Sequence, residues 1–598
     1  MMDAARRYDD VNGEIDRLLM LLNMQYDHTY LIDHTCDTVP GLCELLLPDS
    51  SHSTNVTSVS ELIQLLPEVC PSKELFVILL EQMDTFKDDD IYLALLPPLG
   101  LCIQKLPTKK HLSLAAALET CSAHIVTIPA PDEPSECVIS LRSGFGEVEQ
   151  RLANAVGALL DFITPFVNEL LQLSMSKRCQ PPAVRQTADI TRCLLGLLDK
   201  PLSRVNLCES VDAADGSKTP CRECAKRCVS LLIQLQPDII KLIADANEHR
   251  EAIERQHNIN VHTRQLASGD PLADEMEELY NVEQPLSSVG LAVLMYLVHG
   301  EKICTDSIPQ VYQHHYLLEF NLHLIQTLVT EHSMAVIHKG IILGSSLFTD
   351  VGIKSMDGSM LEHQKMFGLL EALVDAMTSA RVKEISQAAV QFLRTILKSF
   401  DINGRNRLLE FLLISCCSEN VHGLAISLLK DEIDEALCSG ELSLFSAGNS
   451  LKRLLLTVFS RVPDGYRSNL LSSLSDRVMA ALNLLRYLFI RDPRSENLTG
   501  AWDLLSVIEE NFLRPVHAGI VLCRADVNIE IQQLEHGERT STGKQQSTDS
   551  LVEFNIGAHC MPELTVEQQK EAMQSALISL DMMESVLSRV EQLIDTQR

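Results

Sequence analysis

The feature that most constrains the fold of this chain is an apolar residue at every third or fourth position, repeated along most of its 598 residues. Residues 14–22 show the pattern, since Ile15, Leu18, Leu19 and Leu22 share one face of a helix. This period is typical of amphipathic α-helices, and no stretch alternates with the two-residue period of a strand. Glycine and proline are scarce, at 26 and 23 residues, and aromatic residues make up only 5%. The sequence therefore predicts an all-α protein.

Short polar turns separate the helical stretches and indicate a repeat architecture. Helices that are joined in pairs over hundreds of residues are typical of solenoids. We therefore expect a HEAT/armadillo-like α-solenoid of degenerate helical repeats.

Changes in composition divide the chain into four parts. Residues 1–127 form an N-terminal helical region, which a proline-rich stretch follows. Helical repeats occupy 143–245, and residues 246–286, which are charged and poor in apolar residues, predict an exposed acidic insertion. Residues 287–598 form a C-terminal HEAT-like domain, with a flexible Ser/Thr/Gln/Gly-rich loop at 537–552.

Prolines predict where several helices bend or end, because the ring removes a backbone donor and clashes with the preceding turn. Pro97 and Pro98 should kink or divide one segment, and Pro165 should split residues 148–173 into two helices. Pro515 should interrupt a helix over 499–535. Residues 222–244 predict a single helix.

The charge of the chain excludes several classes of ligand. Lys and Arg number 50 and Asp and Glu number 81, which gives a formal net charge of −31. A surface this acidic repels phosphate backbones and anionic membranes, so we expect neither nucleic acid nor a membrane as a partner. A basic protein partner is compatible with it.

We expect a soluble, cytoplasmic protein. No apolar core follows Arg6 and Arg7, so the N-terminus does not resemble a signal peptide. The apolar run at 289–298 is half the length that spans a bilayer. The 18 cysteines lie along helical stretches and are interpreted as free, buried thiols.

Motifs of catalysis and cofactor binding are missing from the sequence. It contains no Gly-x-x-x-x-Gly-Lys-Ser/Thr, no Gly-x-Gly-x-x-Gly, no Gly-x-Ser-x-Gly and no His-Glu-x-x-His. Long helical arrays usually offer surfaces rather than reactive pockets. We therefore expect a protein that is not an enzyme and needs no cofactor.

The best metal candidates are four cysteines, Cys208, Cys221, Cys224 and Cys228. A Cys-x-x-Cys pair with two further thiols could hold a tetrahedral zinc ion. However, the last three follow the i, i+3, i+7 spacing of a buried helical stripe, and only one pair has ligand spacing. We interpret them as core cysteines and expect no metal site.

Two other polar clusters have structural explanations. His314 and His315 would point about 100° apart on a helix, so we expect a surface pair rather than two ligands of one ion. Asp88, Asp89 and Asp90 precede a helical segment, where carboxylates stabilise the N-terminus through the helix dipole.

Residues 475–524 are the most informative for binding. Their first helix should bury a stripe of Val478, Leu482, Leu485 and Phe489. Asp476, Asn483 and Tyr487 fall on the opposite face. These three are either partner-binding residues or part of a seam with a neighbouring helix.

Two further features follow in the same stretch. Trp502, the single tryptophan, comes after the turn at Thr499 and Gly500, and it either packs between helices or anchors an interface. Asn511, Arg514 and His517 surround Pro515, where they either cap a freed carbonyl or bind a partner.

Several blocks relate this chain to a known family. They are Ser475–Tyr487, Thr499-Gly500-x-Trp502, Glu510–Leu513 with Pro515, and Glu584–Glu591, with weaker matches at Pro98-Leu99, Ile103–Leu106, Tyr316–Asn321 and Lys339-Gly340. Through these blocks the chain resembles the glomulin family, the FK506-binding-protein-associated inhibitors of cullin-RING ubiquitin ligases. The resemblance extends from about residue 90 to the end.

The resemblance implies a HEAT-like inhibitor without catalytic activity. Its C-terminal part would bind the RING domain of the RING-box subunit, and through it the cullin, and would block docking of the ubiquitin-conjugating enzyme. An FK506-binding protein is a second implied partner. From position alone, we assign partner binding to Asp476, Asn483, Arg486, Tyr487, Trp502, Asn511, Arg514 and His517.

A second function stays open. A HEAT-type scaffold or transport adaptor could carry basic protein cargo on an acidic surface. Such binding would depend strongly on salt.

Overall fold

The computed structural model describes most of the chain. The described residues are 35–47, 56–129, 146–175, 181–208, 219–264, 285–307, 311–379, 382–415, 419–439, 443–461, 470, 474–536 and 566–598. Within these ranges the regular elements are helices, and the β-structure is one isolated bridge between Met356 and Phe400. The predicted all-α class is confirmed.

The chain forms two compact units, Met1–Ser346 and Leu347–Arg598. Helix α15 (Met334–Val351) runs across the division. The boundary that we predicted from composition lies earlier, between residues 286 and 287. The predicted helix at 14–22 and the loop at 537–552 lie outside the described residues.

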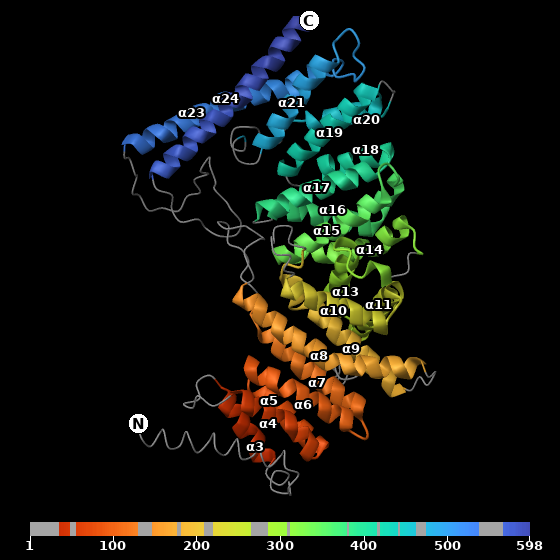
Figure 1. The fold of residues 1–598 in the computed structure, drawn as a ribbon. Helices are drawn as coiled ribbons and strands as arrows, with labels where there is room; N and C mark the ends of the chain where they lie inside the picture. Colours follow the sequence, from red (N-terminus) through yellow and green to blue (C-terminus); the bar gives the residue numbers. More distant parts are fainter. Residues whose placement is uncertain are drawn as a thin grey trace. The chain divides into compact units, whose positions relative to one another are not determined.

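The N-terminal unit consists of helices in two layers (Figure 1). They are α3 (Thr35–Leu46), α4 (Val56–Val69), α5 (Ser72–Thr85), α6 (Asp89–Lys105), α7 (Lys110–Thr127), α8 (Glu147–Met175), α9 (Pro181–Asp199), α10 (Pro220–Leu235), α11 (Ile239–Arg264), α13 (Ser288–Met295) and α14 (His314–Val329). Alternate helices pack on one another: α4, α6, α8 and α10 form one layer, and α5, α7 and α9 form the other. This stacking of consecutive helix pairs is that of an α-solenoid, as predicted.

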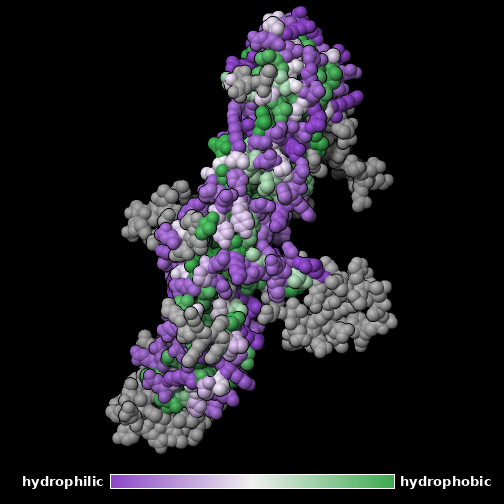
Figure 2. Space-filling view, turned by 90° about the vertical axis from the view of Figure 1, so that its right-hand side faces the viewer, coloured by the Kyte–Doolittle hydropathy of each residue, from purple (hydrophilic) through white to green (hydrophobic). Residues whose placement is uncertain are grey.

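The C-terminal unit continues the same architecture. Its helices are α16 (Gln364–Ser379), α17 (Lys383–Ser399), α18 (Ile402–Glu410), α19 (Glu419–Ser439), α20 (Asn449–Val458), α21 (Ser475–Arg491), α22 (Leu505–Ile508), α23 (Arg514–His536) and α24 (Val566–Gln597). Helix α21 packs on α19 and on α24, and α24 also packs on α23. The helices bury their apolar stripes against one another. Hydrophilic side chains dominate the face of the molecule that Figure 2 shows.

The predicted split at Pro165 did not occur, and Pro97 and Pro98 do not divide their segment. Helix α8 is continuous through Pro165, and α6 is continuous through Pro97 and Pro98. A proline inside a helix costs about 3 kcal/mol. Burying one large apolar side chain contributes about 1.5–3 kcal/mol, so the buried stripe of α8, which includes Ile163 and Phe166, offsets that cost.

The prediction of one helix over 222–244 was wrong, because residues 236–238 separate α10 from α11. Pro237 explains the break, since its ring cannot continue α10. Helix α11 then continues through residues 246–264, where we had predicted an exposed insertion. Its described side chains between 247 and 253 are half-buried or exposed, and residues 265–284 lie outside the described residues.

Two described helices are long and apolar enough to cross a membrane by length and composition, at Glu147–Ser174 and Met334–Val351. Within their most apolar windows, 44% and 50% of the residues are buried inside the structure. Core helices of globular proteins have the same properties. The apolar run at 289–298 is shorter and belongs to the buried helix α13 and the π-helical turn that follows it.

A buried ion pair fixes α18 against α19. Arg405 donates to Glu432, and both side chains are almost inaccessible to solvent, at 8% and 9% exposure. Burial raises the pKa of the Glu432 carboxyl, and the positive charge of Arg405 opposes that change. On the same helix Arg407 pairs with Glu362 at the surface, where the two side chains are 50% and 70% exposed.

These two arginines predict very different effects of substitution. Arg405→Ala leaves the Glu432 charge buried without its cation and should lower the free energy of unfolding by about 3–5 kcal/mol. Arg407→Ala removes only an exposed pair and should cost less than about 1 kcal/mol. Urea unfolding followed by circular dichroism compares them, and equal losses would refute this account.

Candidate protein-binding surface

Helix α21 supplies the framework of the predicted binding region. Its buried residues include the four of the predicted stripe, Val478, Leu482, Leu485 and Phe489. They pack toward α19 and α24. The predicted orientation of this helix is confirmed.

Tyr487 lies in the seam between α21 and α19. Its hydroxyl donates to Asp434 Oδ1 at 2.5 Å, and Lys430 Nζ lies 5.8 Å from the centre of its ring. Burial and the hydrogen bond to Asp434 raise the pKa of Tyr487. The interpretation as an interhelix seam is therefore confirmed for Tyr487, while Asp476 is exposed and Asn483 is half-buried.

The acidic run of α19 connects this seam to the other helices around it. Asp431 pairs with Arg394 of α17 at 3.5 Å, and Glu435 pairs with Lys354 at 2.8 Å. Glu432 pairs with Arg405 of α18, and Asp434 accepts from Tyr487 of α21. Four carboxylates within five residues therefore contact four different segments. We call Asp431, Glu432, Asp434 and Glu435 the acidic junction.

Trp502 packs inside the unit. It is 8% exposed, its ring lies 4.3 Å from that of Phe489, and its Nε1 donates to the Asp492 carbonyl oxygen at 2.8 Å. The Asp492 carboxylate in turn accepts from the Thr499 hydroxyl at 2.6 Å and from the backbone N–H groups of Leu498 and Thr499. Trp502 is therefore buried against the end of α21.

The remaining predicted residues lie in different surroundings. A π-helical turn, Glu509–Leu513, precedes α23 and absorbs the backbone change at Pro515. Asn511 in this turn is half-buried, whereas Arg514 and His517 are exposed one turn apart on α23. Arg486 is exposed on α21.

The hairpin of α23 and α24 exposes apolar side chains that sequence reasoning missed. Val521 and Ile529 of α23 are 50% and 52% exposed, and Ile578 and Met582 of α24 are 60% and 59% exposed. The sequence could have indicated them, because each is an apolar residue outside the buried stripe of its helix. Val521, which follows the buried Ile520, is an example. We call these four residues the hairpin patch.

Polar contacts fix the hairpin in place. Arg524 pairs with Asp581 at 2.7 Å and with Glu584 at 2.6 Å, which joins α23 to α24 (Figure 1). At the end of α24, Gln597 Nε2 donates to the Phe489 carbonyl oxygen at 3.0 Å. The hairpin patch therefore lies on helices that are attached to one another and to α21.

The cysteines of α10 belong to the core. Cys221 and Cys224 donate to the Glu149 and Ala153 carbonyl oxygens of α8, each at 3.4 Å. Burial raises the pKa of Cys221 to about 12 and that of Cys224 to about 11, so both are thiols at neutral pH. Among the described residues, no group of three or more His, Cys, Asp or Glu side chains could hold a metal ion.

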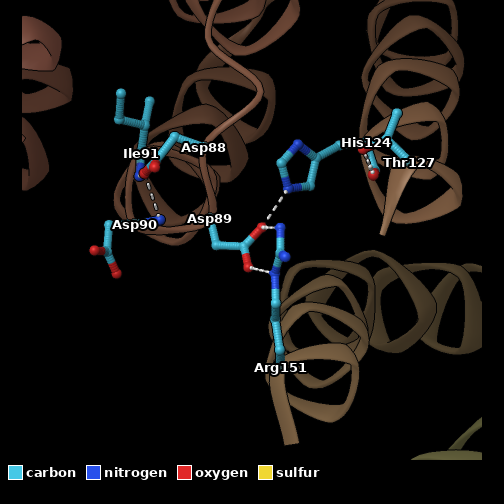
Figure 3. Close-up of polar contacts among 7 residues, drawn as sticks. All are labelled: Asp88, Asp89, Asp90, Ile91, His124, Thr127 and Arg151. Atoms are coloured by element: carbon cyan, nitrogen blue, oxygen red, sulfur yellow. Dashed lines mark hydrogen bonds and ion pairs between the residues drawn. The ribbon is translucent and has the colours of Figure 1, made fainter. Parts of the chain in front are cut away.

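Asp89 joins three helices of the N-terminal unit. Its carboxylate accepts from Arg151 of α8 and lies 3.2 Å from His124 Nε2 of α7 (Figure 3). The neighbouring Asp88 caps α6 by accepting from the Asp90 and Ile91 backbone N–H groups, as predicted for a helix N-terminus. His124 also stacks on Tyr92, with ring centroids 4.3 Å apart.

A second buried cluster surrounds Lys339 of α15. The ammonium group donates to the Ser203 and Val205 carbonyl oxygens at 2.8 Å and 2.7 Å. Burial lowers the pKa of Lys339 to about 8. Because both partners are backbone oxygens that would otherwise be unsatisfied, we assign this lysine a structural role.

His314 and His315 are both exposed at the start of α14, in agreement with the predicted surface pair.

The fold and these surfaces define a class of protein, an all-α repeat protein of the solenoid type that offers surfaces to other proteins. A family model described as an uncharacterised protein family, YAP/Alf4/glomulin, matches residues 325–585. Glomulin from Mus musculus is 28% identical over 537 residues, which are 89% of this chain and 83% of that protein. Glomulin from Homo sapiens is 27% identical over 587 residues, which are 98% of this chain and 91% of that protein.

The chain is thus similar to glomulin along nearly its whole length, and the predicted resemblance is confirmed. Solved structures resemble it only distantly. An engineered protein aligns with a TM-score of 0.21 and 14% identity, covering 75% of this chain and 98% of its own. The Kap95:Nup1 complex aligns with a TM-score of 0.20 and 12% identity, covering 98% of this chain and 66% of its own. The fold class therefore rests on the helices described above.

The contact between His124 and Asp89 predicts a pH dependence of stability. Burial lowers the pKa of His124 below 6.5, although Asp89 opposes the change. The unfolded chain then takes up a proton at a higher pH than the folded chain, so stability is full above pH 6.5 and falls as the pH drops below it. Urea unfolding at pH 7.5 and 5.5 should show this loss, and His124→Gln should reduce it.

The control for this experiment is His314→Gln, which changes an exposed histidine of the same unit. It should leave the pH dependence as it is in the parent. If both variants behave like the parent, His124 does not carry the effect.

Trp502 predicts a large loss of stability rather than a specific loss of binding. Trp502→Ala removes the contact with Phe489 and the hydrogen bond to Asp492, and it should cost about 3–5 kcal/mol. Thermal unfolding monitored by circular dichroism measures this. A variant that unfolds like the parent would show that the indole is not part of the core.

Proposed function

We propose that this protein is a non-catalytic inhibitor of cullin-RING ubiquitin ligases. Its C-terminal unit would bind the RING domain of the RING-box subunit and would block docking of the ubiquitin-conjugating enzyme. The observation that carries the proposal is the similarity to glomulin over 89–98% of the chain. An FK506-binding protein is a further proposed partner, and the cytoplasm is the proposed location.

The hairpin patch is the best candidate for the contact surface in the C-terminal unit. Val521, Ile529, Ile578 and Met582 are each at least half exposed on two helices that pack together. Exposed apolar side chains with polar neighbours are typical of protein interfaces. Arg514 and His517 lie along the same helix as Val521 and would contribute polar contacts at the edge.

A second candidate function is a scaffold or adaptor for basic cargo. The net charge of −31 supports it, since an acidic surface attracts basic segments over long distances. This function would not affect ubiquitin transfer, so one assay separates the two.

The prediction is that the full-length protein inhibits ubiquitin transfer in a reconstituted reaction. It would be titrated into a neddylated cullin–RING-box complex with a conjugating enzyme. Because both proteins would occupy the same RING surface, an excess of conjugating enzyme should relieve the inhibition. No inhibition and no complex by size exclusion would refute the inhibitor function.

Paired variants then test the surface. Val521→Asp with Ile529→Asp should weaken inhibition at least about tenfold, because charges would be buried in the interface. Ile353→Asp changes another exposed apolar residue of the same unit, 73% exposed, and should have no effect. Inhibition by the parent together with equal inhibition by the paired variant would place the contact elsewhere.

A further inference from the structure

Helix α14 of the N-terminal unit carries a row of aromatic rings that the proposed function does not use. Tyr312 lies just before the helix, and Tyr316 and Phe320 follow at intervals of four residues. The ring centroids of Tyr312 and Tyr316 are 5.5 Å apart with planes 19° from parallel. Those of Tyr316 and Phe320 are 6.0 Å apart with planes at 24°. We call these three residues the aromatic row.

The aromatic row is not part of the core stripe of its helix. Leu318 and Leu322 supply that stripe and are each 1% exposed. In contrast, Tyr316 is 47% exposed, and Val311, next to Tyr312, is 82% exposed. Aromatic side chains usually bury their large surface in a core or an interface. Tyr316, which is exposed while Tyr312 and Phe320 on either side of it are half-buried, therefore indicates a docking surface.

Acidic side chains accompany the aromatic row. Glu319 is exposed on the same helix, one turn after Tyr316. Helix α11 lies beside α14, because Asn247 Nδ2 is 3.0 Å from His323 Nε2. Glu248, directly after Asn247, is exposed, whereas Glu251 is exposed but accepts from Arg255 of the same helix at 3.3 Å.

One cation of α11 is engaged within the unit. Arg250 donates to Ser288 Oγ and to Asn247 Oδ1. Glu319 thus places an exposed carboxylate one turn from Tyr316, in a chain whose formal net charge is −31. A partner that fits this surface must combine positive charge with a group that stacks on aromatic rings.

We propose that the aromatic row binds an arginine-bearing segment of a partner protein. A guanidinium group is planar and always charged, so it can stack on a tyrosine ring and pair with a carboxylate at the same time. A lysine ammonium carries the same charge but cannot stack as a plane. The proposal concerns the N-terminal unit and does not depend on inhibition of ubiquitin ligases.

The test compares two peptides with equal charge. A fluorescein-labelled peptide of alternating arginine and serine, and its lysine counterpart, would be titrated with the full-length protein by fluorescence anisotropy. The arginine peptide should bind about fivefold more tightly, because a guanidinium can stack on a ring and pair with a carboxylate at the same time, whereas an ammonium cannot stack as a plane. Equal affinity for the two peptides would overturn the proposal, as would tighter binding of a proline-rich peptide.

Variants connect the difference to the aromatic row. Tyr312→Ala with Tyr316→Ala should abolish the preference for arginine, while Tyr312→Phe with Tyr316→Phe should keep it, because the ring faces remain. Phe367→Ala changes an aromatic residue of the other unit that is 40% exposed, and it should have no effect. Circular dichroism would establish that each variant is folded. An undiminished preference for arginine in the double alanine variant would overturn the assignment.

Discussion

Every described helix of this chain that carries an apolar stripe can bury it only against other helices, and that requirement organises both units. In the N-terminal unit the alternate helices supply the cover, so α8 packs between α6 and α10. Small side chains make such close stacking possible. The thiols of Cys221 and Cys224 reach the backbone of α8, and a Cβ atom at Gly290 of α13 would lie only 2.2 Å from the Leu195 carbonyl oxygen of α9. Stability therefore comes from many similar layers rather than from one central core.

Periodicity alone was enough to predict the class of fold and the buried stripe of α21. It was enough because the stripes of α17 and α21 are regular, and burial decides which face turns inward. Proline was a weaker guide. Pro165 and Pro97 lie inside helices because neighbouring layers hold those helices in place, a tertiary effect that local rules do not contain. Pro237, which follows the end of α10, broke a segment that looked continuous.

The binding region was less predictable, for a related reason. A helical wheel shows that Tyr487 points away from the buried stripe, but it cannot show that Asp434 of another helix meets it there. Trp502 is similar, since its partner is the backbone of Asp492, which becomes a partner only when the turn at Thr499 folds back. The hairpin patch was missed because an isolated apolar residue such as Ile578 is common on surfaces. Only the structure shows that these residues stay exposed on two helices that pack on one another.

Net charge is a poor description of where this protein is acidic. The acidic junction is the densest group of carboxylates in α19, yet three of its members pair with Arg394, Arg405 or Lys354, and the fourth accepts from the Tyr487 hydroxyl. Those charges hold helices together, and their field toward a partner is largely cancelled by the cations beside them. On α14, by contrast, Glu319 is exposed one turn after Tyr316. A long-range attraction for basic partners therefore depends on exposed carboxylates such as Glu319 rather than on the acidic junction. The net charge of the chain does not by itself locate a binding surface.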